Sequence, residues 1–135
     1  MGATAGTTVQ KSRWKKIVAL IIAAIILLPI LYISAKAGIA LAYTYSSGER
    51  AGFVQKFSQK GWICKTWEGE MAQTTQPGVP PLIWDFTVRS DSIAQVLNAQ
   101  IGKRVALHYK QHKGVPTSCF GETEYFVDGV APAPL

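Results

Sequence analysis

The sequence predicts an N-terminal transmembrane α-helix followed by a small, mainly β domain, an OB-like five-stranded barrel with one helix between strands 3 and 4. Three observations predict this fold class. They are nineteen uncharged residues from Ile17 to Ala35, several short segments of alternating apolar and polar residues after residue 50, and one short helical pattern among them. An SH3-like barrel or an irregular β-sandwich would produce a similar order of elements.

The N-terminal region is predicted to be a disordered cytoplasmic tail over residues 1–14 and a transmembrane helix or signal anchor over residues 15–42. The uncharged run would extend about 28 Å as a helix, which matches the hydrocarbon thickness of a bilayer. The anchor residues are Trp14, Lys15 and Lys16 at the first boundary, and Ile17 and Ala35 at the ends of the run.

A cleaved signal peptide is the alternative to a retained anchor. Ala35-Lys36-Ala37 and Ala40-Leu41-Ala42 both have the small-x-small pattern of a cleavage site. The apolar run is longer than the ~7–15 residues usual for such a peptide, which favours retention.

Charge is concentrated before the domain. The net charge is +6, and five of the fourteen basic residues but none of the eight acidic residues precede Tyr43. This leaves nine basic and eight acidic residues in the domain, a balance that disfavours nucleic acid as a partner. Four basic residues lie in the sixteen residues before the uncharged run, and only Lys36 and Arg50 follow it closely. The positive-inside rule therefore predicts a single-pass protein of the inner membrane, with the N-terminus cytoplasmic and the C-terminal domain periplasmic or otherwise extracytoplasmic.

The first three strands are predicted at residues 51–57, 62–70 and 84–88. In the first, Phe53, Gln55 and Phe57 would share one side. Gly69 is expected to mark a bulge in the second strand. In the third, alternation places Trp84, Phe86 and Val88 in the core.

A short helix and two strands complete the predicted domain, which covers residues 43–130. Ser90-Asp91 is typical of a helix start, with Ile93, Val96 and Leu97 on one face and Gly102 at the end. The last strands are expected at residues 103–110, with Val105, Leu107 and Tyr109 inward, and at residues 120–127. Residues 131–135, with their two prolines, are expected to form a flexible tail.

Two segments of the domain carry a resemblance to known proteins. They are Tyr45-Ser46-Ser47-Gly48-Glu49-Arg50-Ala51-Gly52 and Gln55-Lys56-Phe57-Ser58-Gln59-Lys60-Gly61-Trp62-Ile63-Cys64-Lys65-Thr66-Trp67-Glu68-Gly69-Glu70. Both resemble a group of short bacterial membrane-anchored proteins of unassigned function. Some members of that group carry a 6-phosphogluconate dehydrogenase label. A dinucleotide site needs a strand, a Gly-x-Gly-x-x-Gly turn and a helix. Gly48 and Gly52 do not supply that motif, so the resemblance implies membership without a mechanism.

Cys64 and Cys119 are the only cysteines, and export favours a disulfide between them. Two separate buried thiols are the alternative. His108 and His112 lie in strand and turn, where their spacing does not suit a shared metal ion, so we expect no metal and no cofactor.

Function is predicted as non-catalytic binding. The sequence contains no nucleophile motif, and most aromatic residues are assigned to the core. The second strand supplies a candidate binding face of Trp62, Lys65, Trp67, Glu68 and Glu70, and the loop from Gln73 to Leu82 a second candidate surface. We expect the partners to be the lipid bilayer and an envelope protein or other envelope component. An oligonucleotide- or glycan-binding OB domain is the first alternative and requires aromatic rings exposed on a strand face. An enzyme with the 6-phosphogluconate dehydrogenase label of the resembling group is the second and requires a concave pocket with convergent polar groups.

Overall fold

The computed structural model describes residues 7–73 and 77–133. The chain divides into two compact units, Met1–Lys36 and Ala37–Leu135, and each is described by itself.

Helix α1 (Thr7–Ala42) supplies most of the first unit and the first residues of the second. Its segment Gln10–Ala42 has a mean hydropathy of 2.9 and is long and apolar enough to cross a membrane. The prediction of a disordered tail over residues 1–14 is wrong for residues 7–14, which are helical, while residues 1–6 lie outside the described residues. Extending a formed helix adds a hydrogen bond per residue without a new nucleation cost, which explains the earlier start.

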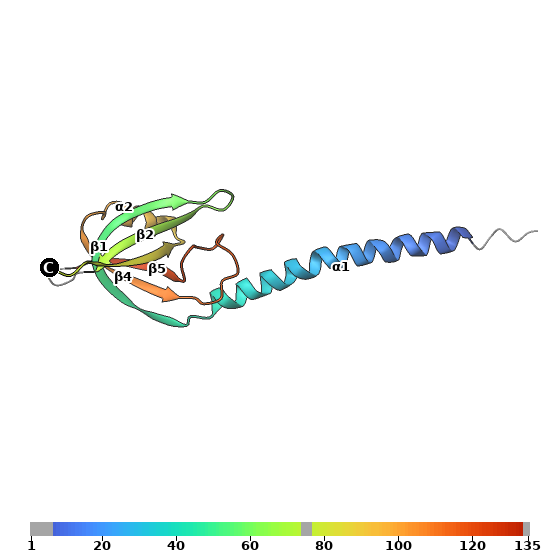
Figure 1. Cartoon of the computed structure of the whole chain (residues 1–135), viewed down its shortest axis with the longest axis horizontal. Helices are drawn as coiled ribbons and strands as arrows, with labels where there is room; N and C mark the ends of the chain where they lie inside the picture. Colours follow the sequence, from blue (N-terminus) through green and yellow to red (C-terminus); the bar gives the residue numbers. More distant parts are fainter. Residues whose placement is uncertain (1–6, 74–76, 134–135) are drawn as a thin grey trace, which may run out of the picture. The chain divides into compact units, whose positions relative to one another are not determined.

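The second unit is a closed barrel of five strands (Figure 1). The order around the barrel is β1-β2-β3-β5-β4, with β3 and β5 parallel and every other pair antiparallel. The predicted order of three strands, a helix and two strands is confirmed. The elements are β1 (Ser46–Lys60), β2 (Thr66–Gln73), β3 (Leu82–Val88), α2 (Asp91–Asn98), β4 (Arg104–Gln111) and β5 (Tyr125–Pro132).

Strand β1 is long enough to close the barrel, because its first half pairs with β4 and its second half with β2. Its register shifts between Val54 and Lys56, which is a bulge. The predicted single side for Phe53, Gln55 and Phe57 is therefore wrong. The extra residue reverses the alternation, so Val54 and Phe57 are buried while Gln55 is exposed.

Strand β2 begins at Thr66, not at residue 62, because residues 61–65 form the β1–β2 loop. Gly61 opens this loop at a φ of +129°, a conformation that favours glycine. Gly69 pairs in regular register with Phe57, so the predicted bulge at Gly69 is wrong. A Cβ at Gly69 would lie 2.3 Å from Cζ of Phe86, and the glycine therefore makes room for that ring.

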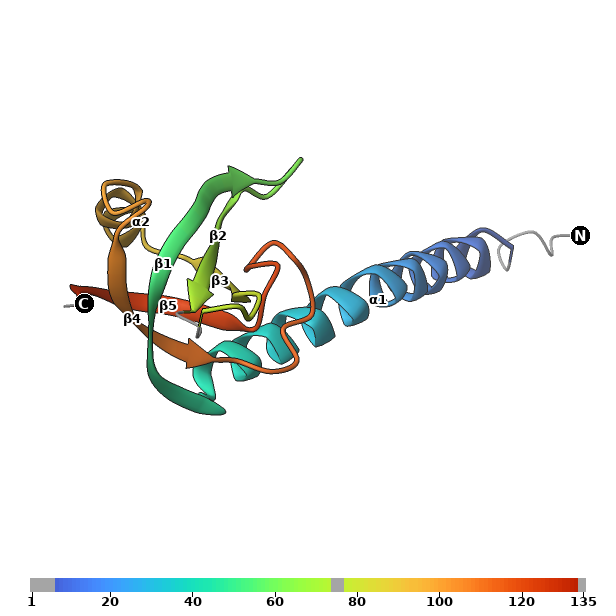
Figure 2. The ribbon, with the colours of Figure 1, turned by 60° about the vertical axis from the view of Figure 1, so that its left-hand side comes forward.

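The core is formed by the inward faces of the strands together with α2. Figure 2 shows α2 at one end of the barrel. The predicted inward positions of Trp84, Phe86 and Val88 are confirmed, and Val105 and Leu107 are also buried. Helix α2 contacts β3 and β5 through Ala94 and Leu97, whereas Val96 is exposed, contrary to prediction. Val96 directly precedes Leu97, and neighbouring helical residues point about 100° apart.

Strand β5 begins at Tyr125, five residues after the predicted start, and continues to Pro132. The prediction of a flexible tail over residues 131–135 is wrong for Ala131 and Pro132, which pair with Ala106 and Val105, while residues 134–135 lie outside the described residues. Pro132 is tolerated because it is the last residue of the strand, where a missing N–H costs little.

Candidate functional site

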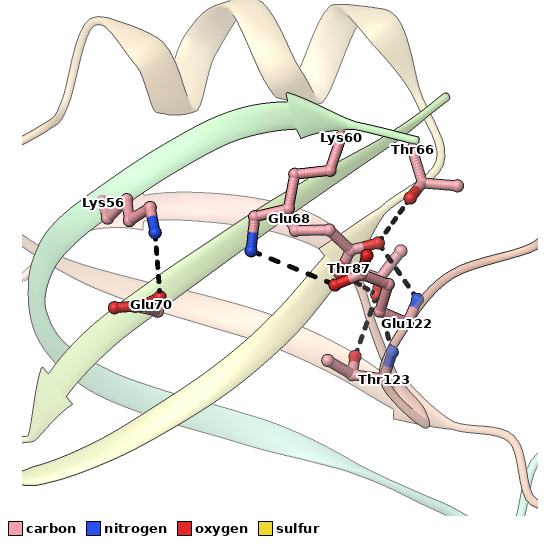
Figure 3. Close-up of polar contacts among 8 residues, drawn as sticks. All are labelled: Lys56, Lys60, Thr66, Glu68, Glu70, Thr87, Glu122 and Thr123. Atoms are coloured by element: carbon pink, nitrogen blue, oxygen red, sulfur yellow. Dashed lines mark hydrogen bonds and ion pairs between the residues drawn. The ribbon is translucent and has the colours of Figure 1, made fainter. Parts of the chain in front are cut away.

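Glu68 on β2 is the centre of a polar network on the outside of the barrel (Figure 3). Its side chain is only 5% exposed. The carboxylate accepts hydrogen bonds from Oγ1 of Thr66 at 2.6 Å, from Oγ1 of Thr87 at 2.6 Å and from the backbone N–H of Glu122 at 3.1 Å. A buried carboxylate needs such donors to offset its loss of water. Glu68 therefore joins β2, β3 and the β4–β5 loop.

The β4–β5 loop (residues 112–124) passes directly over Thr87. The backbone N–H of Thr123 donates to Oγ1 of Thr87 at 3.3 Å, and the two threonine hydroxyl oxygens lie 2.9 Å apart. Gly121 has a φ of +155°, and a Cβ there would lie 2.6 Å from Cγ2 of Thr87. Only glycine suits both the conformation and the close approach.

A pocket of about 210 Å³ opens beside this network. Lys56 bonds Glu70 across the strands at 3.5 Å, and Lys60 lies 4.0 Å from Glu122. The lining holds two lysines and four carboxylates, so the pocket is acidic and repels polyanions. Its residues are Lys56, Lys60, Glu68, Gly69, Glu70, Asp85, Glu122 and Thr123.

A disulfide between Cys64 and Cys119 joins the β1–β2 loop to the β4–β5 loop, with the Cα atoms 4.9 Å apart. The two residues before Cys64 have almost no neighbours, since Trp62 is 103% exposed and Ile63 is 97% exposed. Together with the Glu68 network, the disulfide fixes both loops to the barrel.

A further pocket of about 430 Å³ lies between α2 and β5 and includes Arg89, Lys110 and Asp128. Asp128 contacts His108 and is 3.2 Å from Nζ of Lys110. Burial raises the pKa of Asp128, but the hydrogen bonds and charges of His108 and Lys110 outweigh burial and hold that pKa below its ordinary value.

His112 binds the end of α1. Its Nδ1 lies 3.1 Å from the carbonyl oxygen of Ala40 and 3.0 Å from that of Tyr43, and its ring meets Phe126 edge-on at 5.3 Å. The last carbonyls of a helix have no partner within the helix, so the Nδ1–H of His112 acts there as a C-terminal cap. Both histidines thus have hydrogen-bonding partners in the protein.

Arg50 is partly buried against three aromatic rings. Its guanidinium carbon lies 4.9 Å from the ring centroid of Trp84, 5.4 Å from that of Tyr125 and 5.5 Å from that of Tyr109. Within residues 7–73 and 77–133 it makes no ion pair. The rings come from β3, β4 and β5, so this cluster could not be found from spacing along the chain.

The predicted binding face is not one face. Trp67 points into the barrel, where it stacks on Phe57 at 5.3 Å and donates from Nε1 to Asp91 at 3.0 Å, whereas Glu68 lies outside. Trp62 and Lys65 belong to the β1–β2 loop. Alternation within one strand was the wrong premise, because the strand begins only at Thr66. Glu70 shares the outer pocket with Glu68.

No group of three or more His, Cys, Asp or Glu residues in the described part of the chain is arranged to hold a metal ion.

These features define a class, an OB-fold barrel with a locked β4–β5 loop that follows an apolar helix. The chain belongs to the family described as "Domain of unknown function (DUF8785)", whose model matches residues 43–131. It is similar to the crystal structure of the mitochondrial single-stranded DNA binding protein Rim1 from S. cerevisiae, with a TM-score of 0.50 and 9% identity over 67% of this chain and 95% of that one. No curated protein matches the chain. The structural likeness is one of fold alone, and it confirms the predicted OB-like barrel.

Proposed function

We propose that this protein is a non-catalytic module that α1 anchors in the cytoplasmic membrane and that binds an envelope protein through its barrel. In this proposal the N-terminus is cytoplasmic and the barrel is extracytoplasmic, the side on which a Cys64–Cys119 disulfide persists.

Retention of α1 is supported by the contacts that its last residues make in the barrel unit. Ala37 is buried, and His112 bonds the carbonyl oxygens of Ala40 and Tyr43. Cleavage after Ala37 would remove a buried residue, and cleavage after Ala42 would also remove one acceptor of His112. Either cut would remove packing or hydrogen bonds from the barrel unit. A cleavable signal peptide does not normally provide such contacts, so they favour retention of α1.

The observation that carries partner binding is a group of exposed apolar side chains at the β2–β3 connection. Val79, Leu82 and Ile83 are 56%, 61% and 47% exposed. Single exposed apolar residues are ordinary, but several together beside a loop are typical of a protein-binding surface. This surface overlaps the segment from Gln73 to Leu82 that the sequence singles out, of which residues 74–76 lie outside the described residues.

The polar network supports a non-catalytic role. Glu68 is already engaged by three donors, and Thr87 donates to it, so these groups serve to hold the loop. The oligonucleotide- or glycan-binding alternative has less support. Trp84, Phe86 and Phe57 lie in the core, and the pocket outside β2 is acidic, so an open stacking face on these strands is not formed.

Affinity capture of the tagged full chain from membranes tests the proposal. Leu82→Ser with Ile83→Ser should abolish recovery of a protein partner, because the apolar contact is lost. Val96→Ser, at an equally exposed apolar residue of α2, is the matched control and should keep the partner. The proposal fails if no partner is reproducible and the full chain in detergent instead binds an oligonucleotide or oligosaccharide. A C-terminal alkaline phosphatase fusion should be active, and an inactive fusion contradicts the orientation.

A further inference from the structure

The β1–β2 loop ends in a fixed apolar tip formed by Trp62 and Ile63. Both side chains are almost fully exposed, at 103% and 97%. The tip is held by the disulfide at Cys64 and by the tight turn at Gly61, where an added Cβ would lie 1.8 Å from the carbonyl oxygen of Cys64. A held loop cannot fold its apolar residues back onto the barrel. Their exposure therefore indicates an apolar surface outside the protein.

The β4–β5 loop links this tip to the place where α1 enters the barrel unit. His112 bonds the carbonyl oxygens of Ala40 and Tyr43, and Cys119, seven residues later, is joined to Cys64. Seven extended residues reach at most about 25 Å, so Cys119 lies within about 25 Å of His112, and the Cα atoms of Cys119 and Cys64 are 4.9 Å apart. Figure 1 shows the β1–β2 and β4–β5 loops on the same side of the barrel as the first residues of β1.

Other exposed aromatic residues lie at the same entry point. Tyr43 and Tyr45 directly follow α1 and are both exposed, and the backbone N–H of Tyr45 bonds the carbonyl oxygen of Gln111 at the start of the β4–β5 loop. Tryptophan and tyrosine favour the headgroup region of a bilayer, where a ring can be buried while its polar atom stays hydrated. Lys65, beside Cys64, is exposed and suits anionic headgroups.

We propose that Trp62 and Ile63 insert into the lipid headgroup region of the bilayer that α1 crosses, as a second membrane contact. This inference rests on the proposed retention of α1 as an anchor. The occupant is lipid because the disulfide ties the tip to the β4–β5 loop, and that loop holds the end of the apolar helix through His112. Two contacts orient the barrel and leave Leu82 and Ile83 free for a protein partner.

Tryptophan fluorescence of the full chain in vesicles tests the insertion. The chain has four tryptophans, of which Trp67 and Trp84 pack in the core. In a Trp14→Phe background, the difference between this variant and Trp14→Phe with Trp62→Phe isolates the emission of Trp62. The vesicles contain phosphatidylcholine with or without phosphatidylglycerol, and the quenchers are dibrominated phosphatidylcholine and aqueous iodide.

Trp62 should emit at shorter wavelength in vesicles than a water-exposed tryptophan, be quenched by the brominated lipid and be protected from iodide. Leu82→Trp in the double-Phe background is the matched control at another exposed apolar position, and it should be quenched by iodide and not by brominated lipid. Iodide quenching of Trp62 as strong as that of the control overturns the inference. Equal quenching of both by brominated lipid also overturns it, because the barrel would then lie on the membrane without a preferred tip. Intact mass of the membrane-extracted chain tests α1 retention separately.

Discussion

Replacing Glu68 removes a side chain that holds two strands and the β4–β5 loop together. Glu68→Ala leaves the hydroxyls of Thr66 and Thr87 and the backbone N–H of Glu122 without their shared acceptor. Glu68→Gln keeps a carbonyl oxygen at one of the two carboxylate positions. The two variants therefore separate the loss of the hydrogen bonds from the loss of the charge.

The geometry sets the size of each effect. Oε1 accepts from Thr66 and Glu122 and Oε2 from Thr87, so a glutamine can keep two bonds and turn its amide toward the Thr87 hydroxyl, which then accepts. Hydrogen bonds to a charged group contribute about 1.5–3 kcal/mol each, and some of the freed donors will find water. We expect Glu68→Ala to lower the free energy of unfolding by about 3–5 kcal/mol and Glu68→Gln by about 1–2 kcal/mol.

Denaturation of the full chain in detergent, followed by the fluorescence of the core tryptophans, measures these losses. Glu70→Ala is the matched control on the same strand, because the Lys56–Glu70 pair is at least one-third exposed on both sides and is 3.5 Å long. Such a pair contributes about 0–1 kcal/mol. A loss for Glu68→Ala no larger than that for Glu70→Ala would refute the structural role of the network.

The other predictions concern the disulfide, the core and acid stability, each measured as the melting temperature of the full chain. Cys64→Ser with Cys119→Ser opens a crosslink between residues 55 apart and should cost about 4 kcal/mol in the chain-entropy model, and reduction of the wild type should match it. An unchanged melting temperature on reduction would contradict this. Gly69→Ala places a Cβ 2.3 Å from Cζ of Phe86 and should cost about 1–3 kcal/mol, with partial recovery on adding Phe86→Leu, whereas additive losses would argue against the clash. The lowered pKa of Asp128 stabilises the folded state at every pH above 3.8, the ordinary pKa of this group, and this stability is lost as the pH falls through the lowered pKa. Below about pH 4 the wild type should therefore lose stability more steeply than Asp128→Asn. Parallel curves for the two proteins would rule out that contribution.

The fold was largely predictable because its elements carry local patterns. Strand β3 alternates without interruption, so Trp84, Phe86 and Val88 were placed correctly in the core. The bulge near Gln55 has no such pattern. Its extra residue is fixed by pairing with β2, which the chain reaches only after the β1–β2 loop. Strand ends were also misplaced, since Trp62 and Ile63 have strand-like chemistry but lie in a loop.

The candidate site was less predictable because its parts are distant in sequence. In the sequence, Glu68 is one of several acidic residues on an outer strand face. In the structure it is buried, because the β4–β5 loop passes over Thr87 and donates the backbone N–H of Glu122 to its carboxylate. Gly121 was the available clue, since a glycine inside the strand predicted at residues 120–127 suggests a close backbone approach. That clue does not name the neighbour.

Arg50 is the clearest case of a residue whose role depends on closure of the barrel. By sequence it counts as a positive charge shortly after the membrane segment, where it would attract anionic headgroups. The structure places its guanidinium beside the rings of Trp84, Tyr109 and Tyr125. A cation over an aromatic ring is stabilised by about 0.5–1 kcal/mol at an exposed site and by about 2 kcal/mol where the contact is desolvated. These rings hold the guanidinium against the barrel, and Arg50 stays partly exposed. Ten residues separate Arg50 from the β1–β2 loop, where the basic side chains are Lys60 and Lys65, and Lys60 lies 4.0 Å from Glu122. Attraction of the tip to a bilayer therefore depends on Trp62 and Ile63 more than on net charge.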